Sequence, residues 1–186
     1  MFKTLYILLV SISFYISAEY KNTNGEVIDK SIKDLIRWQR NQKKPVLASI
    51  ETSDEWQSID LDSSNNYMIW IGHSTFLIKK NNLTILTDPV FSNRASPFRR
   101  FGPKRLIPPS ISLESLPSID VITISHNHYD HLDIRSLKMI SKANPDLIFL
   151  IPEGDLDIFK KRNISNVKEF NWWQDILIDE FLFTFT

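Results

Sequence analysis

Three histidines and one aspartate fall within six residues of this 186-residue chain, in the run His126-Asn127-His128-Tyr129-Asp130-His131. Ionisable groups placed so close together need a bound metal or protons to be tolerated. Alternate side chains of a short loop can point to a common centre, so His126 and His128 can hold one metal. Asp130 and His131 can then turn towards a second metal, and we expect Asp130 to act in catalysis as well. Imidazole and carboxylate ligands suit zinc, and they also admit iron or manganese.

The composition limits the other kinds of site. There is no cysteine, which excludes disulfides and thiolate metal sites and leaves histidine and carboxylates as the strong metal ligands. The 22 basic residues equal the 22 acidic residues, so no nucleic-acid partner is expected. A hydrophobic content of 42% indicates a globular domain with a core rather than a disordered chain.

Regular elements must position the histidine motif. The apolar run 119–125 predicts a buried strand that delivers the motif at its end. Asp133 is placed to cap a helix that runs through Asn144 and is ended by Pro145. Asn81 and Asn82 tolerate positive φ and predict a hairpin turn. Other apolar runs predict strands over 67–71, 75–78, 83–87, 147–151, 167–170 and 181–186, and a helix over 156–162.

The N-terminal part of the chain divides into two segments. Residues 1–18 contain one cation, Lys3, an apolar stretch and a small residue at Ala18, a pattern typical of a signal peptide. The apolar stretch is shorter than the roughly 20 residues of a membrane span, although an uncleaved N-terminal anchor and a buried apolar segment stay as alternatives. We therefore expect an exported (periplasmic or secreted) or membrane-associated protein. Residues 19–66 predict an extension with a short docking helix over 31–40, capped by Ser31.

A Pro- and Arg-rich loop runs from Asp88 to Pro109, and loops of this length in compact domains tend to be functional or mobile. Its cations could bind a phosphate or an anionic membrane surface, or could simply be solvated. The five cations are Arg94, Arg99, Arg100, Lys104 and Arg105.

Several blocks of the sequence resemble one family in the same order. The run 126–131 is similar to the H-x-H-x-D-H signature of metallo-β-lactamase-fold hydrolases. The surrounding blocks look like the bacterial relatives of N-acylphosphatidylethanolamine-hydrolysing phospholipase D. These blocks are 70–78, 86–92, 94–97, 102–105 and 124–133, with Asp34-Leu35, Trp38-Gln39 and Trp172-Trp173 also in place.

The resemblance implies an α/β fold, the αββα sandwich, with two zinc ions in a cleft at its edge. In this family His126 and His128 would bind the first zinc. Asp130 and His131 would bind the second. Asp88 would orient a ligand imidazole, with an ordinary turn aspartate as the alternative. We expect His73 to be a structural or cleft-lining residue rather than a ligand, because the signature does not include it.

The family's site also needs a third histidine, a bridging aspartate and a last histidine, which follow a strand like 181–186. The chain has none of these, so we expect residues 67–186 to form only the N-terminal half of the domain, with impaired metal binding. The expected lineage function is a metal-dependent phosphodiesterase acting on a phospholipid of the N-acylphosphatidylethanolamine type. The alternatives are a metallo-hydrolase for a lactone or another phosphodiester, and a non-catalytic remnant of a split gene. A complementing C-terminal fragment would be a possible partner.

Overall fold

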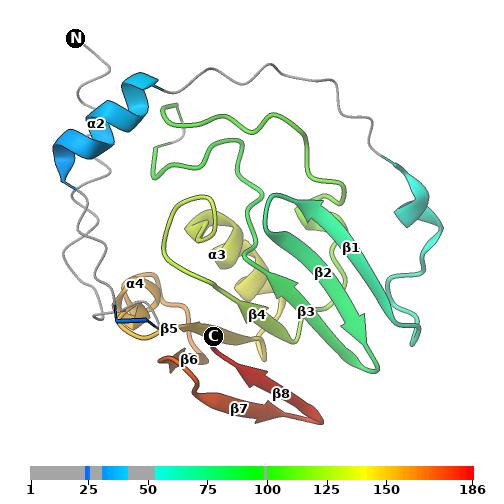
Figure 1. Ribbon diagram of the computed structural model, residues 1–186. Coiled ribbons are helices and arrows are strands. Elements are labelled where there is room, and N and C mark those ends of the chain that lie inside the picture. The colour runs from blue at the N-terminus through cyan, green and yellow to red at the C-terminus, as the bar shows by residue number, and fades with distance from the viewer. Residues whose placement is uncertain (1–23, 26–30, 42–52, 99) are drawn as a thin grey trace. The chain divides into compact units, whose positions relative to one another are not determined.

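Figure 1 shows the computed structural model of the chain, which describes residues 24–25, 31–41, 53–98 and 100–186. Two compact units are present, residues 1–51 and residues 52–186, and each is described by itself. The predicted signal peptide or anchor (1–18) and Arg99 lie outside the described residues. Among the described residues, no helix has both the length and the apolar character needed to cross a membrane.

The first unit contains the predicted short helix, α2 (Ile32–Asn41). Ser31 caps it: the Asp34 N–H donates to Ser31 Oγ at 3.3 Å, and the Ser31 N–H donates to Asp34 Oδ2 at 3.1 Å. This reciprocal arrangement satisfies backbone donors of the first turn that lack partners within the helix. The helix is therefore confirmed, and its docking on the main domain stays a prediction.

The second unit is built on one six-stranded mixed sheet with the strand order β1-β2-β3-β4-β5-β6 (Figure 1). The first three strands pair antiparallel, and the predicted β2–β3 turn places Asn81 at φ 51°. Strands β4 to β6 then join β3 in parallel. The bounds are β1 (Tyr67–Gly72), β2 (Thr75–Lys80), β3 (Leu83–Thr87), β4 (Val121–Thr123), β5 (Ile148–Pro152) and β6 (Val167–Phe170). The predicted strand over 119–125 is thus shorter than expected.

Helices cover one face of this sheet. The N–H of Arg135 donates to Asp133 Oδ1 at 3.2 Å, so Asp133 caps α3 (Ile134–Ala143) as predicted. Leu137 of α3 is fully buried in one cluster with Leu77 and Leu86 of the sheet. Phe159 of α4 (Leu156–Lys160) joins the same cluster, its ring centroid 5.5 Å from that of Phe149. Short 3-10 turns lie at Glu55–Ser58 (η2) and Leu113–Ser115 (η3).

A hairpin covers the opposite face. Strands β7 (Asp175–Ile178) and β8 (Phe181–Thr184) form a two-stranded antiparallel sheet. One side of the hairpin packs on a second buried cluster, which includes Val121 and Leu150 of the sheet. The hairpin residues on that side are Ile176, Ile178, Phe181 and Phe183. Leu177 and Leu182, which pair on the other side, are 66% and 63% exposed. Helices, mixed sheet and hairpin therefore form three layers, which confirms the predicted α/β class.

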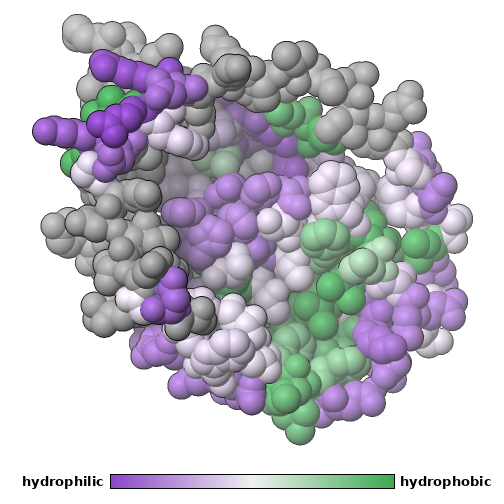
Figure 2. Space-filling model, in the orientation of Figure 1, coloured by the Kyte–Doolittle hydropathy of each residue, from purple (hydrophilic) through white to green (hydrophobic). Residues whose placement is uncertain are grey.

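The apolar surface of the second unit is uneven. In Figure 2 the most hydrophobic part of the visible face lies over the region of β2, β3 and the β7–β8 hairpin. The predicted strand over 181–186 is present but ends at Thr184.

The ring of Trp172 packs beside that of Phe185, with centroids 5.3 Å apart, whereas Trp173 is 64% exposed. The two neighbouring tryptophans thus have different environments.

Backbone pairing orders the long loop between β3 and β4. Arg94 and Lys104 form an isolated antiparallel bridge. The N–H of Arg105 donates to Asn93 O at 2.9 Å, and that of Ala95 donates to Pro103 O at 3.1 Å. The loop therefore contains a hairpin-like segment that is closed by backbone hydrogen bonds.

Candidate metal centre

The histidine motif lies at the carboxyl edge of the parallel part of the sheet. It follows β4 after Ile124 and Ser125, and it turns back into the start of α3. The N–H groups of His131 and Leu132 both donate to the carbonyl of His128, at 3.0 and 2.7 Å. These bonds close a tight turn that places side chains of the motif near the ends of neighbouring strands.

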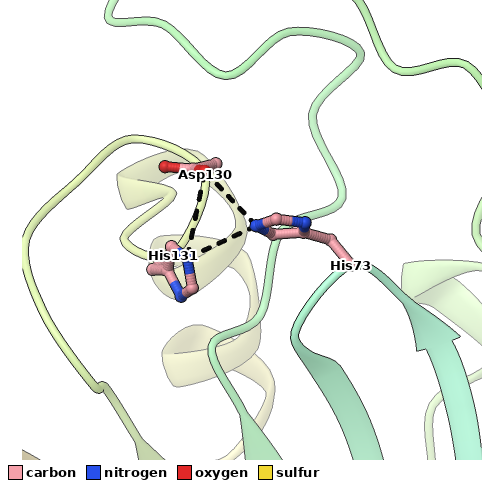
Figure 3. A group of neighbouring side chains, drawn as sticks. All are labelled: His73, Asp130 and His131. Atoms are coloured by element: carbon pink, nitrogen blue, oxygen red, sulfur yellow. Dashed lines mark hydrogen bonds and ion pairs between the residues drawn. The ribbon is translucent and has the colours of Figure 1, made fainter. Parts of the chain in front are cut away.

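Three potential ligand atoms converge in this turn (Figure 3). His73 Nε2 lies 3.3 Å from Asp130 Oδ2 and 3.3 Å from His131 Nε2. The Asp130 and His131 atoms are 3.9 Å apart. His73 comes from the β1–β2 turn, whereas the other two residues belong to the motif. Two imidazole nitrogens and one carboxylate oxygen at this spacing form a donor set that fits a divalent metal.

His126 and His128 lie beside this group. Their rings are nearly perpendicular, with centroids 4.7 Å apart, and the His126 and His131 centroids are 4.0 Å apart. Burial lowers the pKa of His126, and the neighbouring His131 and His128 lower it further, against the opposing effect of Asp88 and Asp130. A lowered pKa favours the neutral imidazole, which is the form that binds metals. The four predicted motif ligands are therefore close together in the structure.

Asp88 is buried directly behind His131. Its Oδ2 lies 2.8 Å from His131 Nδ1, and Ser125 donates to the same carboxylate through its N–H and its hydroxyl, both at 2.7 Å. The Asp88 side chain therefore has partners at both of its oxygens. This is the contact expected of a residue that orients a ligand imidazole, since it leaves His131 Nε2 facing Asp130 and His73. The orienting role stays a prediction; Ser125 was not predicted as a partner.

His73 lies beside the motif residues, although the sequence did not indicate that it would be so close to them. The structure brings it together with Asp130 and His131, although 58 residues separate it from His131. The signal available in the sequence was the Gly72-His73 step between two predicted strands, 67–71 and 75–78. Nothing in the spacing of the histidine motif points to this residue.

The predicted phosphate-binding cations divide into two groups. The guanidinium of Arg105 donates to the carbonyls of Val90 and Ser92, and burial lowers its pKa against the opposing charge of Asp133. Arg94 Nη1 donates to Gly102 O at 2.6 Å. Arg100 and Lys104 are exposed. Contact of these cations with a phosphate or a lipid stays a prediction, as it does for Arg99, which lies outside the described residues.

Comparison with known proteins identifies the family. The model of the β-lactamase superfamily domain matches residues 67–185, from the first residue of β1 to just beyond β8. The chain belongs to the metallo-β-lactamase superfamily. This membership confirms the resemblance seen in the sequence, and it implies a metal cofactor, for which the donor set described above is suitable.

Two similar proteins are N-acyl-phosphatidylethanolamine-hydrolyzing phospholipases D. N-acyl-phosphatidylethanolamine-hydrolyzing phospholipase D 1 of Caenorhabditis elegans is 37% identical over 65% of this chain and 34% of its own length. The mitochondrial N-acyl-phosphatidylethanolamine-hydrolyzing phospholipase D of Saccharomyces cerevisiae is 35% identical over 60% of this chain and 24% of its own length. The chain therefore spans about a quarter to a third of the length of these relatives.

A solved structure supports the superfamily fold. The crystal structure of a possible metal-dependent hydrolase from Veillonella parvula matches with a TM-score of 0.50 and 18% sequence identity. The match covers 63% of this chain and 45% of that chain. At this identity the similarity concerns the fold alone.

Proposed function

We propose that this chain carries metal-binding residues of a metal-dependent hydrolase, specifically a phosphodiesterase of the N-acylphosphatidylethanolamine phospholipase D type. The observation that carries the proposal is the convergence of the motif side chains at the sheet edge, with His131 Nδ1 2.8 Å from the buried carboxylate of Asp88. The identity of 35–37% to two proteins of that description supports the substrate class. Zinc is the proposed metal, because nitrogen and carboxylate donors without thiolates suit it.

The protein residues prepare the site in three ways. Asp88 fixes the His131 ring so that Nε2 is available as a ligand. Burial lowers the pKa of His126, which favours the neutral imidazole that binds metals. Asp130 contributes negative charge that offsets the charge of a bound cation. Metal held by His126, His128, Asp130 and His131 would supply Lewis acidity towards water and towards the charge on a phosphoryl group.

The loop between β3 and β4 is the proposed contact with the lipid. Exposed cations and exposed apolar side chains alternate along it: Arg100 and Lys104 lie among Phe98, Phe101 and Leu106, which are 47%, 59% and 68% exposed. Cations next to apolar side chains favour an anionic membrane surface, since the charges attract headgroups while the apolar groups enter the interface. The apolar stretch 5–16 supports a further proposal, namely that the protein is exported or membrane-associated.

The experiment that tests the proposed function is a set of parallel turnover assays with zinc, iron or manganese. The full chain is given an N-acylphosphatidylethanolamine, a water-soluble phosphodiester and a lactone. It is assayed alone and with a C-terminal polypeptide that supplies the family's later ligands. Release of N-acylethanolamine that disappears in a His126→Ala/His128→Ala variant is the expected result. Turnover of the lactone alone would replace the phosphodiesterase by another hydrolase, and no turnover in any arm would contradict the proposal.

A further inference from the structure

We propose that His73 is a direct protein ligand of the metal that Asp130 and His131 bind. The proposal rests on the proposed function only in requiring that the chain binds a metal. It assigns His73, which lies outside the histidine motif, a role in holding that metal. The site would then have three protein ligands within the described residues.

The distances support a shared ion. Two ligand atoms that each lie about 2.0–2.1 Å from a tetrahedral zinc are about 3.3–3.4 Å apart. His73 Nε2 lies 3.3 Å from Asp130 Oδ2 and 3.3 Å from His131 Nε2. The third distance, 3.9 Å between Asp130 Oδ2 and His131 Nε2, needs only a small shift of the half-exposed carboxylate. The three atoms thus surround a position that one metal ion can reach.

The hydrogen-bond geometry also favours a metal. Because His131 Nδ1 faces the Asp88 carboxylate at 2.8 Å, its proton belongs on that nitrogen, and Nε2 presents a lone pair. His73 Nε2 points at both this lone pair and the Asp130 carboxylate. A cation at the centre can bind all three donors at once, whereas a single imidazole proton can be directed at only one of them.

The backbone holds His73 in a conformation that few residues adopt. Its φ is 52°, and Gly72 before it has φ 142°. Trp70 Nε1 donates to the His73 carbonyl at 2.9 Å. On the other side, a Cβ at Gly72 would lie 3.2 Å from Arg105 Nη1, so the half-buried guanidinium lies close to the turn. A non-glycine residue in the left-handed region persists where its surroundings fix it, and such residues concentrate at functional sites.

Three protein ligands change what the chain can do. Catalytic zinc sites use three protein ligands and keep one position open. His73, Asp130 and His131 provide that number, with side chains that are 52%, 48% and 15% exposed. The site would therefore bind one ion independently of His126 and His128.

The test uses the fact that the chain has only four histidines. In the His126→Ala/His128→Ala variant of the full chain, purified without a histidine tag, only His73 and His131 remain. We expect this variant to bind one equivalent of Zn²⁺ or Co²⁺. X-ray absorption spectroscopy of the bound metal should then show two imidazole ligands. Adding His73→Asn should weaken binding by more than about 100-fold, because even loss of an outer partner costs 10- to 100-fold. Asparagine tolerates positive φ, so the turn should survive.

The control is Asn81→Ala in the same double variant, since Asn81 also has positive φ, at 51°, but lies in the β2–β3 turn. Metal binding should be unchanged by it. One imidazole per metal in the double variant, unchanged affinity after His73→Asn, or metal binding by the wild type but not by the double variant would each overturn the role of His73 and leave the proposed function standing. A wild-type chain that binds no metal would overturn both.

Discussion

The carboxylate of Asp88, directly after β3, lies 2.8 Å from Nδ1 of His131, 43 residues later in the chain. The same carboxylate accepts the N–H and the hydroxyl of Ser125. It therefore ties the end of β3 to both ends of the histidine motif. Asp88 is only 6% exposed, so these donors satisfy a charge that would otherwise be costly to bury.

Replacing Asp88 by asparagine should weaken metal binding by about 10- to 100-fold, the usual cost of losing a partner behind a ligand. An amide has one acceptor oxygen where the carboxylate uses two, so one of the groups around it loses its acceptor. Isothermal titration with Zn²⁺ measures the change. Asp120→Asn is a suitable control, since Asp120 accepts the Thr84 N–H at 2.7 Å in another part of the sheet. Equal affinities of wild type and Asp88→Asn would contradict the orienting role.

Arg105 and Lys104 are neighbouring cations that should behave differently. Arg105→Met removes the donor that the Val90 and Ser92 carbonyls share, and should lower the free energy of unfolding by about 1–3 kcal/mol. Lys104→Ala changes an exposed side chain and should cost less than about 0.5 kcal/mol. Urea denaturation monitored by tryptophan fluorescence compares the two variants. If both lose the same stability, the guanidinium does not support the loop.

If the same loop contacts a membrane, removing its exposed cations should weaken vesicle binding. The Arg100→Ala/Lys104→Ala variant should bind anionic vesicles more weakly, by about 1 kcal/mol for each cation near the surface. Co-sedimentation with vesicles containing anionic and zwitterionic lipid measures the difference, and added salt should reduce it. Unchanged partition of this variant would exclude these two cations from lipid binding.

Gly102 lies next to the backbone pairing that closes the hairpin-like segment of the loop, and its φ is 103°. A Cβ there would lie 2.5 Å from Ser96 Cβ and 3.2 Å from the Ala95 carbonyl, neither of which can swing away. Gly102→Ala should therefore lower the free energy of unfolding by about 1–3 kcal/mol. Adding Ser96→Gly removes the colliding atom, so the losses of the two variants should be less than additive in chemical denaturation. Full additivity would mean that the collision is not the cause.

Asp155 is buried beside the motif and accepts the Asn127 amide at 2.8 Å. Burial raises its pKa and the charge of Glu169 raises it further, against the effect of the Asn127 hydrogen bond. A raised folded-state pKa means that the native protein loses stability as pH rises through that value. Asp155→Asn lacks this loss, so its Tm relative to wild type should increase from acidic to neutral pH. A series of thermal melts tests the sign, and a decreasing difference would contradict it.

Local rules explain what could be predicted for the fold. Asp133 caps α3 because its short acidic side chain can accept a backbone N–H, and Asn81 forms a turn because it tolerates positive φ. Strand β7 escaped prediction, since Asp175–Ile178 is short and gains its stability from pairing with β8 and from packing on the sheet. Such contacts are not visible in a four-residue pattern.

The candidate metal centre also combines residues placed by local sequence with residues placed by tertiary contacts. The sequence by itself determined that His126, His128, Asp130 and His131 would lie together, because six consecutive residues cannot separate far. Only the tertiary structure decided that His73 would join them from 58 residues away, and that Asp88 would lie behind His131. The physical reason is the strand order and direction, which place the β1–β2 turn, the end of β3 and the end of β4 at the same edge of the sheet. Residue spacing thus brings the motif side chains together, and sheet pairing between distant segments adds His73 and Asp88 to them.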